Sequence, residues 1–206
     1  MLPVPPLETE RLLIRPFTME DLDAIYQILD IDLLTADMGS EQAKTRAERE
    51  RWLQWTIWSY EELAQLYQPL YGDRAVVHKH TRQVIGACGF VPSFGPFGQL
   101  PSMPSADQEA DAHFNAPEFG LYYALSPTYQ RQGYATEATK ALIDYAFTQL
   151  SLKRIVATTT YGNVASMGVM RKVGMRIEKN PYPDPSWFQV VGILENGPAN
   201  ALQTGP

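Results

Sequence analysis

The chain has 206 residues, 45% of them hydrophobic, and a formal net charge of −6 at pH 7. This length favours one domain with enough apolar residues to bury a sizeable core. No run of Lys and Arg is long enough to follow a phosphate backbone, which argues against nucleic acid as the main partner.

The single cysteine and the three histidines limit the metal and redox chemistry. Cys88 stands alone, so a disulfide within the chain and a site of several cysteines are excluded, and its place in a predicted strand favours a small buried filler. His78 and His80 alternate on a predicted strand and would share a face. Without a third ligand nearby in sequence, we expect polar strand residues there and no metal.

The N-terminus and the apolar runs bear on location. The first seven residues are rich in proline and lack the basic and apolar segments of a signal peptide. No apolar run approaches the roughly 20 residues that are needed to cross a bilayer. We therefore expect a soluble, cytoplasmic protein with no membrane partner.

The first third of the chain predicts a strand followed by two helices. Residues 11–17 (RLLIRPF) predict the strand, and Thr18 followed by Asp21 marks a helix start before apolar residues at helical spacing. Residues 41–67 contain no Pro or Gly and predict a second helix, with tryptophans at three-residue intervals: Trp52, Trp55 and Trp58. Packing against a sheet is the favoured reading of that stripe, and the lining of an acceptor pocket is the alternative.

A hairpin and a long insertion follow. Residues 74–80 and 83–91 are rich in Val and Ile around a short turn and predict two paired strands. The composition of residues 92–117 then shifts to Pro, Gly, Ser and Ala, with three phenylalanines: Phe94, Phe97 and Phe114. We expect this insertion to lack regular structure, as a functional lid or as a disordered segment.

The rest of the chain predicts a strand, loop, helix, strand unit and one further helix and strand. Residues 118–125 (EFGLYYAL) predict a central strand, and 133–150 carry one apolar helical face. The later elements are a strand at 154–160, a helix at 163–173 ended by Gly174, and a strand at 186–194. We expect a single domain over residues 7–194 and a flexible tail over 195–206.

The loop between the central strand and its helix has the features of an anion site. Several backbone N–H groups at the start of this helix lack a helical partner and point outward. Gly133 lets a phosphate approach the backbone, and Ala135 keeps the first turn thin. Neither a Walker A loop nor a full dinucleotide-binding glycine pattern is present, so an ordinary nucleotide fold is the poorer match.

Three sequence blocks resemble one family. Gln130-Arg131-Gln132-Gly133-Tyr134-Ala135 looks like the Gln/Arg-x-x-Gly-x-Gly/Ala signature of the GCN5-related N-acetyltransferases (GNAT), and Thr136-Glu137-Ala138 resembles the branch that acetylates the N-termini of ribosomal proteins. Asn163-x-x-Ser166 followed by Lys172-Val173-Gly174-Met175 is similar to a second block of that branch. The opening Leu7-Glu8-Thr9-Glu10-Arg11-Leu12 resembles its first strand.

The resemblance implies an α/β fold with acetyl-coenzyme A as cosubstrate. The expected architecture is a mixed, strongly twisted sheet, flanked by helices and splayed between its fourth and fifth strands, here residues 118–125 and 154–160. The pantetheine arm would pair with the backbone of Tyr123, Ala124 and Leu125. The pyrophosphate would lie on the six residues Gln130, Arg131, Gln132, Gly133, Tyr134 and Ala135. Asn163 and Ser166 would hold the far side, although the position of Asn163 also suits a helix N-cap.

The implied reaction is direct attack of a primary amine on the acetyl thioester. The amine must be neutral and the developing oxyanion needs a donor, for which the backbone N–H at Tyr123 or Ala124 is the candidate. Glu118 is the candidate base, directly or through water, and an exposed carboxylate without function at the strand end is the alternative. Many family members protonate the thiolate with a tyrosine where this chain has Met170, which cannot donate a proton, so Ser166 acting through water is the substitute considered.

The acceptor and the assembly are left open by the sequence. The acceptor is the N-terminus of a protein or the amine of a small molecule, and the residues that contact it lie in variable helices and in the long loop. The alternative to an enzyme is an acetyl-coenzyme A sensor without turnover, which the methionine at position 170 supports. A homodimer is the expected assembly only because it is the commonest symmetric one.

Overall fold

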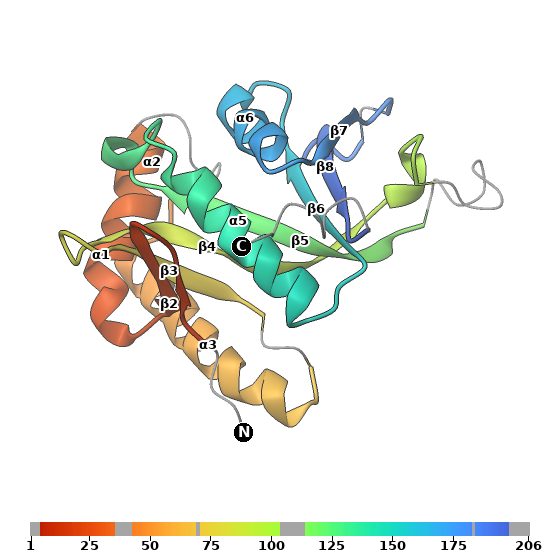
Figure 1. Ribbon diagram of the computed structural model, residues 1–206. Coiled ribbons are helices and arrows are strands. Elements are labelled where there is room, and N and C mark those ends of the chain that lie inside the picture. Colours follow the sequence, from red (N-terminus) through yellow and green to blue (C-terminus); the bar gives the residue numbers. More distant parts are fainter. Residues whose placement is uncertain (1–4, 36–42, 69–70, 104–113, 183, 198–206) are drawn as a thin grey trace. The chain divides into compact units, whose positions relative to one another are not determined.

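The computed structural model describes residues 5–35, 43–68, 71–103, 114–182 and 184–197 (Figure 1). Its strands form one sheet in the order β1-β2-β3-β4-β5-β6-β8-β7. Their bounds are β1 Leu7–Glu8, β2 Leu12–Pro16, β3 Asp73–His78, β4 Val84–Gly95, β5 Ala116–Leu125, β6 Arg154–Thr159, β7 Arg176–Lys179 and β8 Val190–Glu195. β5 and β6 are parallel, whereas β1 to β4 and β6 to β8 pair antiparallel, so the predicted mixed α/β sheet with flanking helices is confirmed.

The chain divides into two compact units. Unit 1 comprises Met1–Val91 and Tyr122–Leu142, and unit 2 comprises Pro92–Leu121 and Ile143–Pro206. The helices are α1 Leu22–Tyr26, α2 Leu33–Thr35, α3 Arg46–Gln65, α5 Tyr134–Thr148 and α6 Val164–Lys172, with a π-helix at Gln27–Asp32 between α1 and α2. The register between β5 and β6 is one pair, Gly120 with Val156 in unit 2.

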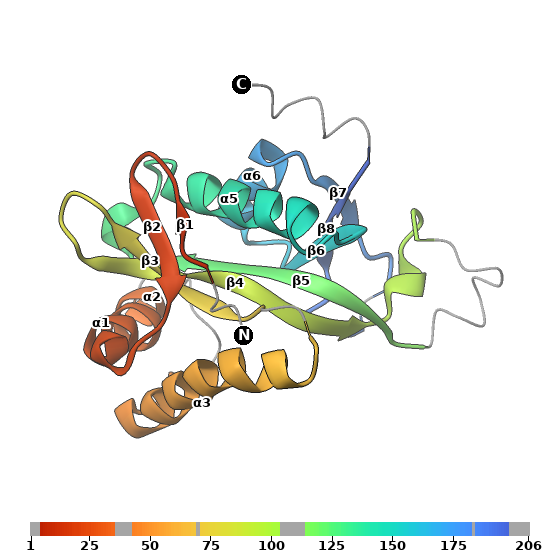
Figure 2. The same cartoon turned by 60° about the horizontal axis from the view of Figure 1, so that its bottom comes forward.

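In unit 1, helices cover both faces of the strands. Figure 2 shows α1 and α3 on one face of β2, β3 and β4, and the start of α5 on the other. The core beneath α1 and α3 takes alternate residues of the strands, because successive side chains of a strand point to opposite faces. Its buried members are Phe17, Leu22, Ile25, Ile28, Leu29, Leu33, Leu53, Ala75, Val77 and Ala87.

The predicted start of the first helix is confirmed. The N–H of Thr18 donates to Asp21 Oδ2 at 2.9 Å. The Arg15 guanidinium donates to both carboxylate oxygens of Asp21, at 2.7 and 2.8 Å. The first turn is a 3-10 helix, Met19–Asp21, from which α1 continues. Burial raises the pKa of Asp21, but the hydrogen bonds from Arg15 and Thr18 outweigh it, so the pKa lies below its ordinary value.

The predicted packing of the tryptophan stripe is wrong for two of its three members. Trp52 packs edge-on against Phe17, at 5.7 Å between ring centroids, whereas the Trp55 and Trp58 side chains are 63% and 61% exposed. Residues three apart step by about −60° around a helix, so the stripe turns away from the sheet within two steps. Trp52 and Trp55 line an open pocket with three charged residues of the α3 start, Lys44, Glu48 and Arg51.

In unit 2, the prediction that residues 92–117 lack regular structure is wrong at both ends. β4 continues to Gly95, and β5 begins at Ala116. Phe97 and Leu100 are buried with Phe188, because apolar side chains in a small-residue segment gain most by packing into the core. Residues 104–113, the middle of the expected lid, lie outside the described residues.

Other boundaries also differ from the predictions. β3 ends at His78 and the hairpin turn begins there, so His80 is not in the strand, although its ring lies edge-on to that of His78 with the centroids 6.4 Å apart. β7 is missing from the prediction because its four residues, RIEK, are too polar and too short to show an apolar pattern. Most of the predicted tail, residues 198–206, lies outside the described residues.

Candidate active site

The loop from β5 to α5 is held by its own side chains. The Gln130 amide donates to the carbonyl of Leu125 at 2.9 Å, and the Gln132 amide donates to the carbonyl of Thr128 at 2.9 Å. Arg131 has a φ of +59° and Gly133 a φ of +88°. The two glutamine side chains thus close the turn, and its backbone is what faces an incoming group.

The start of α5 fits an anion. The first N–H groups of a helix have no partner within it and carry the positive end of the helix dipole. A side chain on Gly133 would be strained by the positive φ, and its Cβ would lie 3.3 Å from Nη2 of Arg11. The glycine therefore permits the turn that precedes the helix, and the helix N–H groups that follow it suit a pyrophosphate.

Arg11 and Glu137 clamp this helix start to β2. Arg11 Nη2 lies 2.6 Å from Glu137 Oε2, and its Nη1 donates to the carbonyl of Gln132 at 3.1 Å. Burial raises the pKa of Glu137, but the hydrogen bonds from Thr9 and Arg11 outweigh it and the pKa is lowered. The Arg11 guanidinium also lies over the Tyr134 ring, 4.3 Å from its centroid. Both residues belong to the sequence blocks that resemble the GNAT family. Their ion pair was not predicted, because the two residues lie 126 positions apart in the chain.

β4 and β5 lie close together where the pantetheine arm is predicted to bind. The N–H of Ser126 donates to the carbonyl of Ile85 at 2.9 Å. A Cβ on Gly86 would lie 2.2 Å from the carbonyl oxygen of Ala124, so only glycine fits there. Tyr123 and Ala124 are half-buried and Leu125 is buried. The end of β5 is therefore firmly placed in unit 1.

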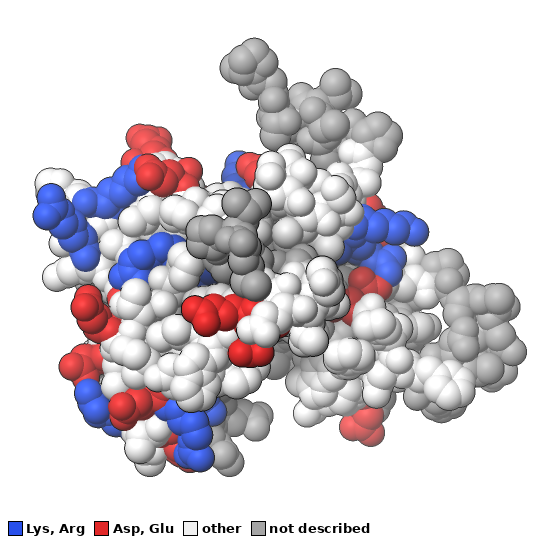
Figure 3. Space-filling view, turned by 90° about the horizontal axis from the view of Figure 1, so that it is seen from below, with Lys and Arg blue, Asp and Glu red and all other residues white. Residues whose placement is uncertain are grey.

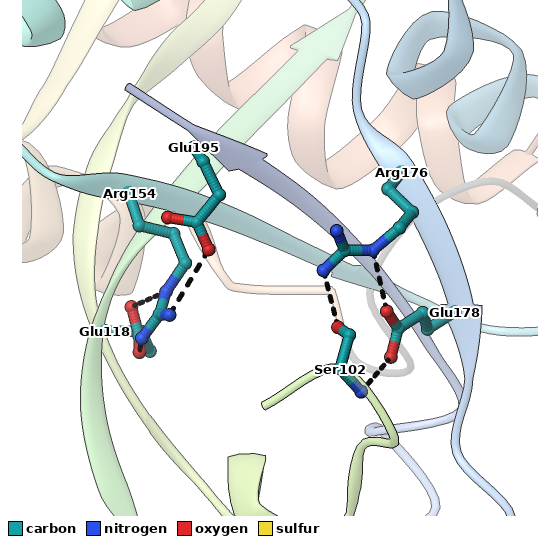
Figure 4. Close-up of polar contacts among 6 residues, drawn as sticks. All are labelled: Ser102, Glu118, Arg154, Arg176, Glu178 and Glu195. Carbon is teal, nitrogen blue, oxygen red and sulfur yellow. Dashed lines mark hydrogen bonds and ion pairs between the residues drawn. The ribbon is translucent and has the colours of Figure 1, made fainter. Parts of the chain in front are cut away.

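Glu118 is bound by an arginine at the start of β5 (Figure 4). Arg154 Nε donates to Glu118 Oε2 at 3.0 Å, and its Nη2 contacts Oε1. Arg154 Nη1 also lies 3.4 Å from Glu195. The hydrogen bond that Arg154 donates to Glu118 outweighs burial and raises the Arg154 pKa. Glu118, the candidate base, is thus ion-paired and mostly buried rather than an exposed carboxylate, and its role in catalysis stays a prediction.

The second predicted block lies at the start of α6. Asn163 Oδ1 accepts from the N–H of Ser166 at 3.0 Å, so the N-cap role of Asn163 is confirmed. Met170 is 1% exposed, and a Cβ on Gly192 would lie 3.0 Å from its sulfur. Met170 fills the core of unit 2 between α6 and β8. Contacts of Asn163 and Ser166 with a cofactor stay predictions.

The remaining chemical groups have structural surroundings. Cys88 is buried, which raises its pKa to about 12 and keeps the thiol protonated, as expected of a filler. His78 lies between Thr81 Oγ1 at 3.0 Å and the Tyr134 hydroxyl at 3.2 Å.

Within the described ranges, no cluster of three potential metal ligands occurs, and no helix is long and apolar enough to cross a membrane. Basic and acidic side chains are interspersed on the face seen in Figure 3.

Comparisons with known proteins show the family and the fold. A family model described as an acetyltransferase (GNAT) domain matches residues 11–176. The chain is 29% identical over 175 residues to the uncharacterized N-acetyltransferase YoaA of Bacillus subtilis, covering 84% of each protein. A match to the uncharacterized N-acetyltransferase YnaD of that bacterium is 39% identical over 66 residues and spans 39% of YnaD. The solved ribosomal-protein-S5-alanine acetyltransferase of Vibrio fischeri has the same fold, with a TM-score of 0.66 at 19% identity over 95% of this chain and 98% of that one.

The fold and the family match define the class of protein as an acetyl-coenzyme A-dependent acyltransferase. The family model covers most of the chain, from the first long strand to the start of β7. The chain belongs to the GNAT family of acetyltransferases, as the three sequence blocks predicted. Enzymes of this family use acetyl-coenzyme A as cosubstrate and an amine as acceptor.

Proposed function

We propose that this chain transfers an acetyl group from acetyl-coenzyme A to a primary amine by direct attack in a ternary complex. The observation that carries the proposal is the start of α5, where the positive-φ Gly133 leads into the first turn of a helix, whose N–H groups favour an anion. In this proposal the pyrophosphate binds the backbone of residues 130–135. The pantetheine arm follows the backbone of Tyr123 to Leu125.

The chemistry asks three things of the chain. The amine must lose a proton before it attacks, the developing oxyanion needs a donor, and the sulfur leaves as thiolate or thiol. We assign the oxyanion donor to the backbone N–H of Tyr123 or Ala124. A thiol with a pKa near 8.5 leaves readily without an acid, so a buried methionine at position 170 is compatible with turnover.

The alternative function is a sensor that binds acetyl-coenzyme A without turnover. Its support is the burial of Met170 in the core, where no proton donor takes the place of the tyrosine. Release of coenzyme A thiol in the presence of an amine separates the two functions. We favour the enzyme, because the loss of an acid costs little with this leaving group.

The acceptor class is one of two. The fold relative from Vibrio fischeri acetylates an alanine of a ribosomal protein by its printed name, but the likeness at 19% identity supports the fold alone. We propose a protein N-terminus or a small-molecule amine, in a cytoplasmic protein that forms a homodimer. An amine panel and light scattering test these assignments.

The test of the cofactor site is the substitution Gly133→Asp. A carboxylate at the start of α5 repels a pyrophosphate, and its Cβ crowds Arg11. Calorimetry should show that the variant binds acetyl-coenzyme A at least about 100-fold more weakly than the wild type. The reason is that a negative carboxylate would face the negative pyrophosphate at the helix start. A folded variant with undiminished affinity would remove the site from α5.

A further inference from the structure

Asp73, the first residue of β3, is a carboxylate of unit 1 that lies outside the proposed cofactor site. Its Oδ1 is buried and, across the described ranges, has no hydrogen-bond partner. The residue as a whole is half-buried, so part of it is reached by solvent. Buried polar atoms are nearly always paired, so an orphaned carboxylate oxygen indicates a proton or a ligand that completes it.

The sheet places Asp73 in one row with Tyr122. Asp73 is opposite Gly89 in the register of β3 and β4. β4 and β5 lie side by side in both ribbon views and run in opposite directions, and Ser126 donates to Ile85. A Cβ on Gly86 would lie 2.9 Å from the Cα of Leu125, and counting three residues along each strand from this contact puts Tyr122 beside Gly89. Because glycine has no side chain, no side chain of β4 stands between Asp73 and Tyr122 in this row.

The row lies on the face covered by α1 and α3. Ala75 and Ala87, two residues along from Asp73 and Gly89, belong to the core beneath these helices. Tyr122 packs against the same core, and so does Ala124. Since side chains two apart on a strand share a face, Asp73 points to the side of the variable helices. Those helices are where acceptor contacts are expected.

Among the described residues, the Asp73 carboxylate has no ion pair. Arg49 of α3 is buried and binds Asp30 at 2.6 Å, so this pair is neutral. Burial raises the pKa of Asp73 to about 6, and the Arg49 charge opposes this increase. The Tyr60 hydroxyl contacts the carbonyl of Asp73 and fixes its backbone. Titratable or charged groups that act on this row from the packed elements are Asp30, Arg49, Tyr60, Arg74, Cys88 and Tyr122.

We propose that Asp73 anchors the ammonium group of the acetyl acceptor and takes its proton, with the Tyr122 hydroxyl beside it. This inference rests on the proposed function, because it assigns the base of that reaction. Burial, with the Asp73 charge adding to it, raises the pKa of Tyr122, so its phenol stays protonated and can donate. Tyr122 immediately precedes the backbone that we assign to the pantetheine arm.

The two protons that the ammonium loses are taken up by the Asp73 carboxylate, which passes its proton to solvent, and by the leaving thiolate. One proton of the ammonium passes to the Asp73 carboxylate and then to solvent, leaving the neutral amine. Its nitrogen lone pair forms the bond to the acetyl carbon, and the bond from that carbon to sulfur breaks. The second proton leaves the nitrogen as the amide forms and is taken up by the thiolate. The products are the acetylated amine, the thiol of coenzyme A and one proton.

The test is Asp73→Asn, with Asp23→Asn as the matched control. Asp23 is an exposed carboxylate of α1 in the same unit, with 83% of its side chain exposed. The probe acceptors are spermidine and a short peptide with a free N-terminal alanine. We expect kcat/KM of Asp73→Asn to fall at least about 100-fold, the lower end for a positioned base, with unchanged acetyl-coenzyme A affinity. Asp23→Asn should behave as the wild type.

The pH profile separates a base from a structural residue. Wild-type kcat/KM should level off above about pH 6, since an ionised Asp73 can accept the proton of a bound ammonium. Asp73→Asn should instead rise about tenfold per pH unit up to the pKa of the acceptor amine, because only free neutral amine then reacts. Equal profiles, or a loss confined to Glu118→Gln, would overturn the assignment.

A measurement of amine binding tests the Asp73 anchor even if the protein has no acetyltransferase activity. Should the wild type release no thiol with either probe, calorimetry of spermidine binding in the presence of coenzyme A gives the answer. Binding that weakens at least about tenfold in Asp73→Asn but not in Asp23→Asn supports the anchor within a sensor. Equal or absent spermidine binding in all three proteins overturns the inference.

Discussion

Glu118 and Asp73 are both carboxylates at the start of a strand, but their surroundings differ. Both oxygens of Glu118 are held by Arg154, so an incoming amine would have to displace a guanidinium. The Oδ1 atom of Asp73 has no partner in the described chain and lies on the face of the variable helices. Residue type and strand position, which the sequence shows, do not distinguish the two carboxylates, whereas their partners do.

The Glu118–Arg154 pair should contribute to stability. Glu118→Gln removes the charge that Arg154 contacts at the edge of unit 2, and charged hydrogen bonds of this kind are worth about 1.5–3 kcal/mol. The side chains are 10% and 26% exposed, so we expect a loss of about 1–2 kcal/mol in the free energy of unfolding. Urea unfolding of Glu118→Gln, Arg154→Gln and the double variant measures the coupling. Additive losses would show that the pair contributes nothing.

The buried Asp30–Arg49 pair should be more sensitive. Arg49→Met leaves the Asp30 carboxylate, which is 3% exposed, without its guanidinium. Removing one partner of a buried pair typically costs about 3–5 kcal/mol because the other charge stays desolvated. Urea unfolding should show a loss in this range. Asp30→Asn/Arg49→Met should recover part of it, and a single variant as stable as the wild type would contradict the account.

At the scale of elements, the start of α6 tests a cap against a cofactor contact. Asn163→Ala removes the bond to the Ser166 N–H and should cost about 1 kcal/mol in the free energy of unfolding. If Asn163 also contacts the cofactor, acetyl-coenzyme A affinity should fall as well. Urea unfolding and calorimetry on the same variant give both quantities. Asn163→Ser, which keeps the cap, is the control, and unchanged affinity in both variants leaves Asn163 as a cap alone.

The strands and helices that were predicted correctly each depend on a pattern within one short stretch of sequence. Strands β2, β3, β5 and β6 show apolar or β-branched runs, and α5 shows a helical period, so each was expected close to its observed bounds. Gly174 ends α6 with a φ of +86°, as its position predicted. These features depend on residues within one element, which is why a single sequence contains them.

The elements and contacts that were missed depend on residues far apart. The Arg11–Glu137 clamp and the Asp73–Tyr122 row each join strands or helices from distant parts of the chain. Residues 92–103 were predicted irregular from their composition, yet Phe97 and Leu100 pack against Phe188. Figure 4 also shows Ser102 held between Arg176 and Glu178 of β7. The composition of a segment indicates whether it would be irregular on its own. It does not show the core against which the segment packs in the folded protein.

For the whole molecule, stability should depend on pH with two opposite contributions. Asp21 and Glu137 have lowered pKa values in the folded protein, so their contribution is present above about pH 4 and is lost as the pH falls through those values. Asp73 has a raised value, from 3.8 to about 6, so its charged form opposes folding. Stability should therefore fall as the pH rises from about 4 to about 6.

Asp73→Asn should remove that fall. A shift of this size corresponds to about 1–3 kcal/mol, so the variant should be more stable than the wild type at pH 7 and similar to it at pH 4. Urea unfolding at both pH values measures the difference. A variant that is less stable at pH 7 would mean that Asp73 has a partner in the folded protein. A gain in stability with a loss of activity is the pattern expected of a functional residue.

Release of coenzyme A thiol from acetyl-coenzyme A is the measurement that tests the acetyltransferase most directly. The wild type should release thiol only when a primary amine is present, with one acetyl group found on the amine by mass spectrometry for each thiol released. Gly133→Asp should release none at the same acetyl-coenzyme A concentration. Tight binding of acetyl-coenzyme A by the wild type, with no thiol release across peptides with free N-termini, polyamines and aminoglycosides, would contradict the enzyme and leave the sensor.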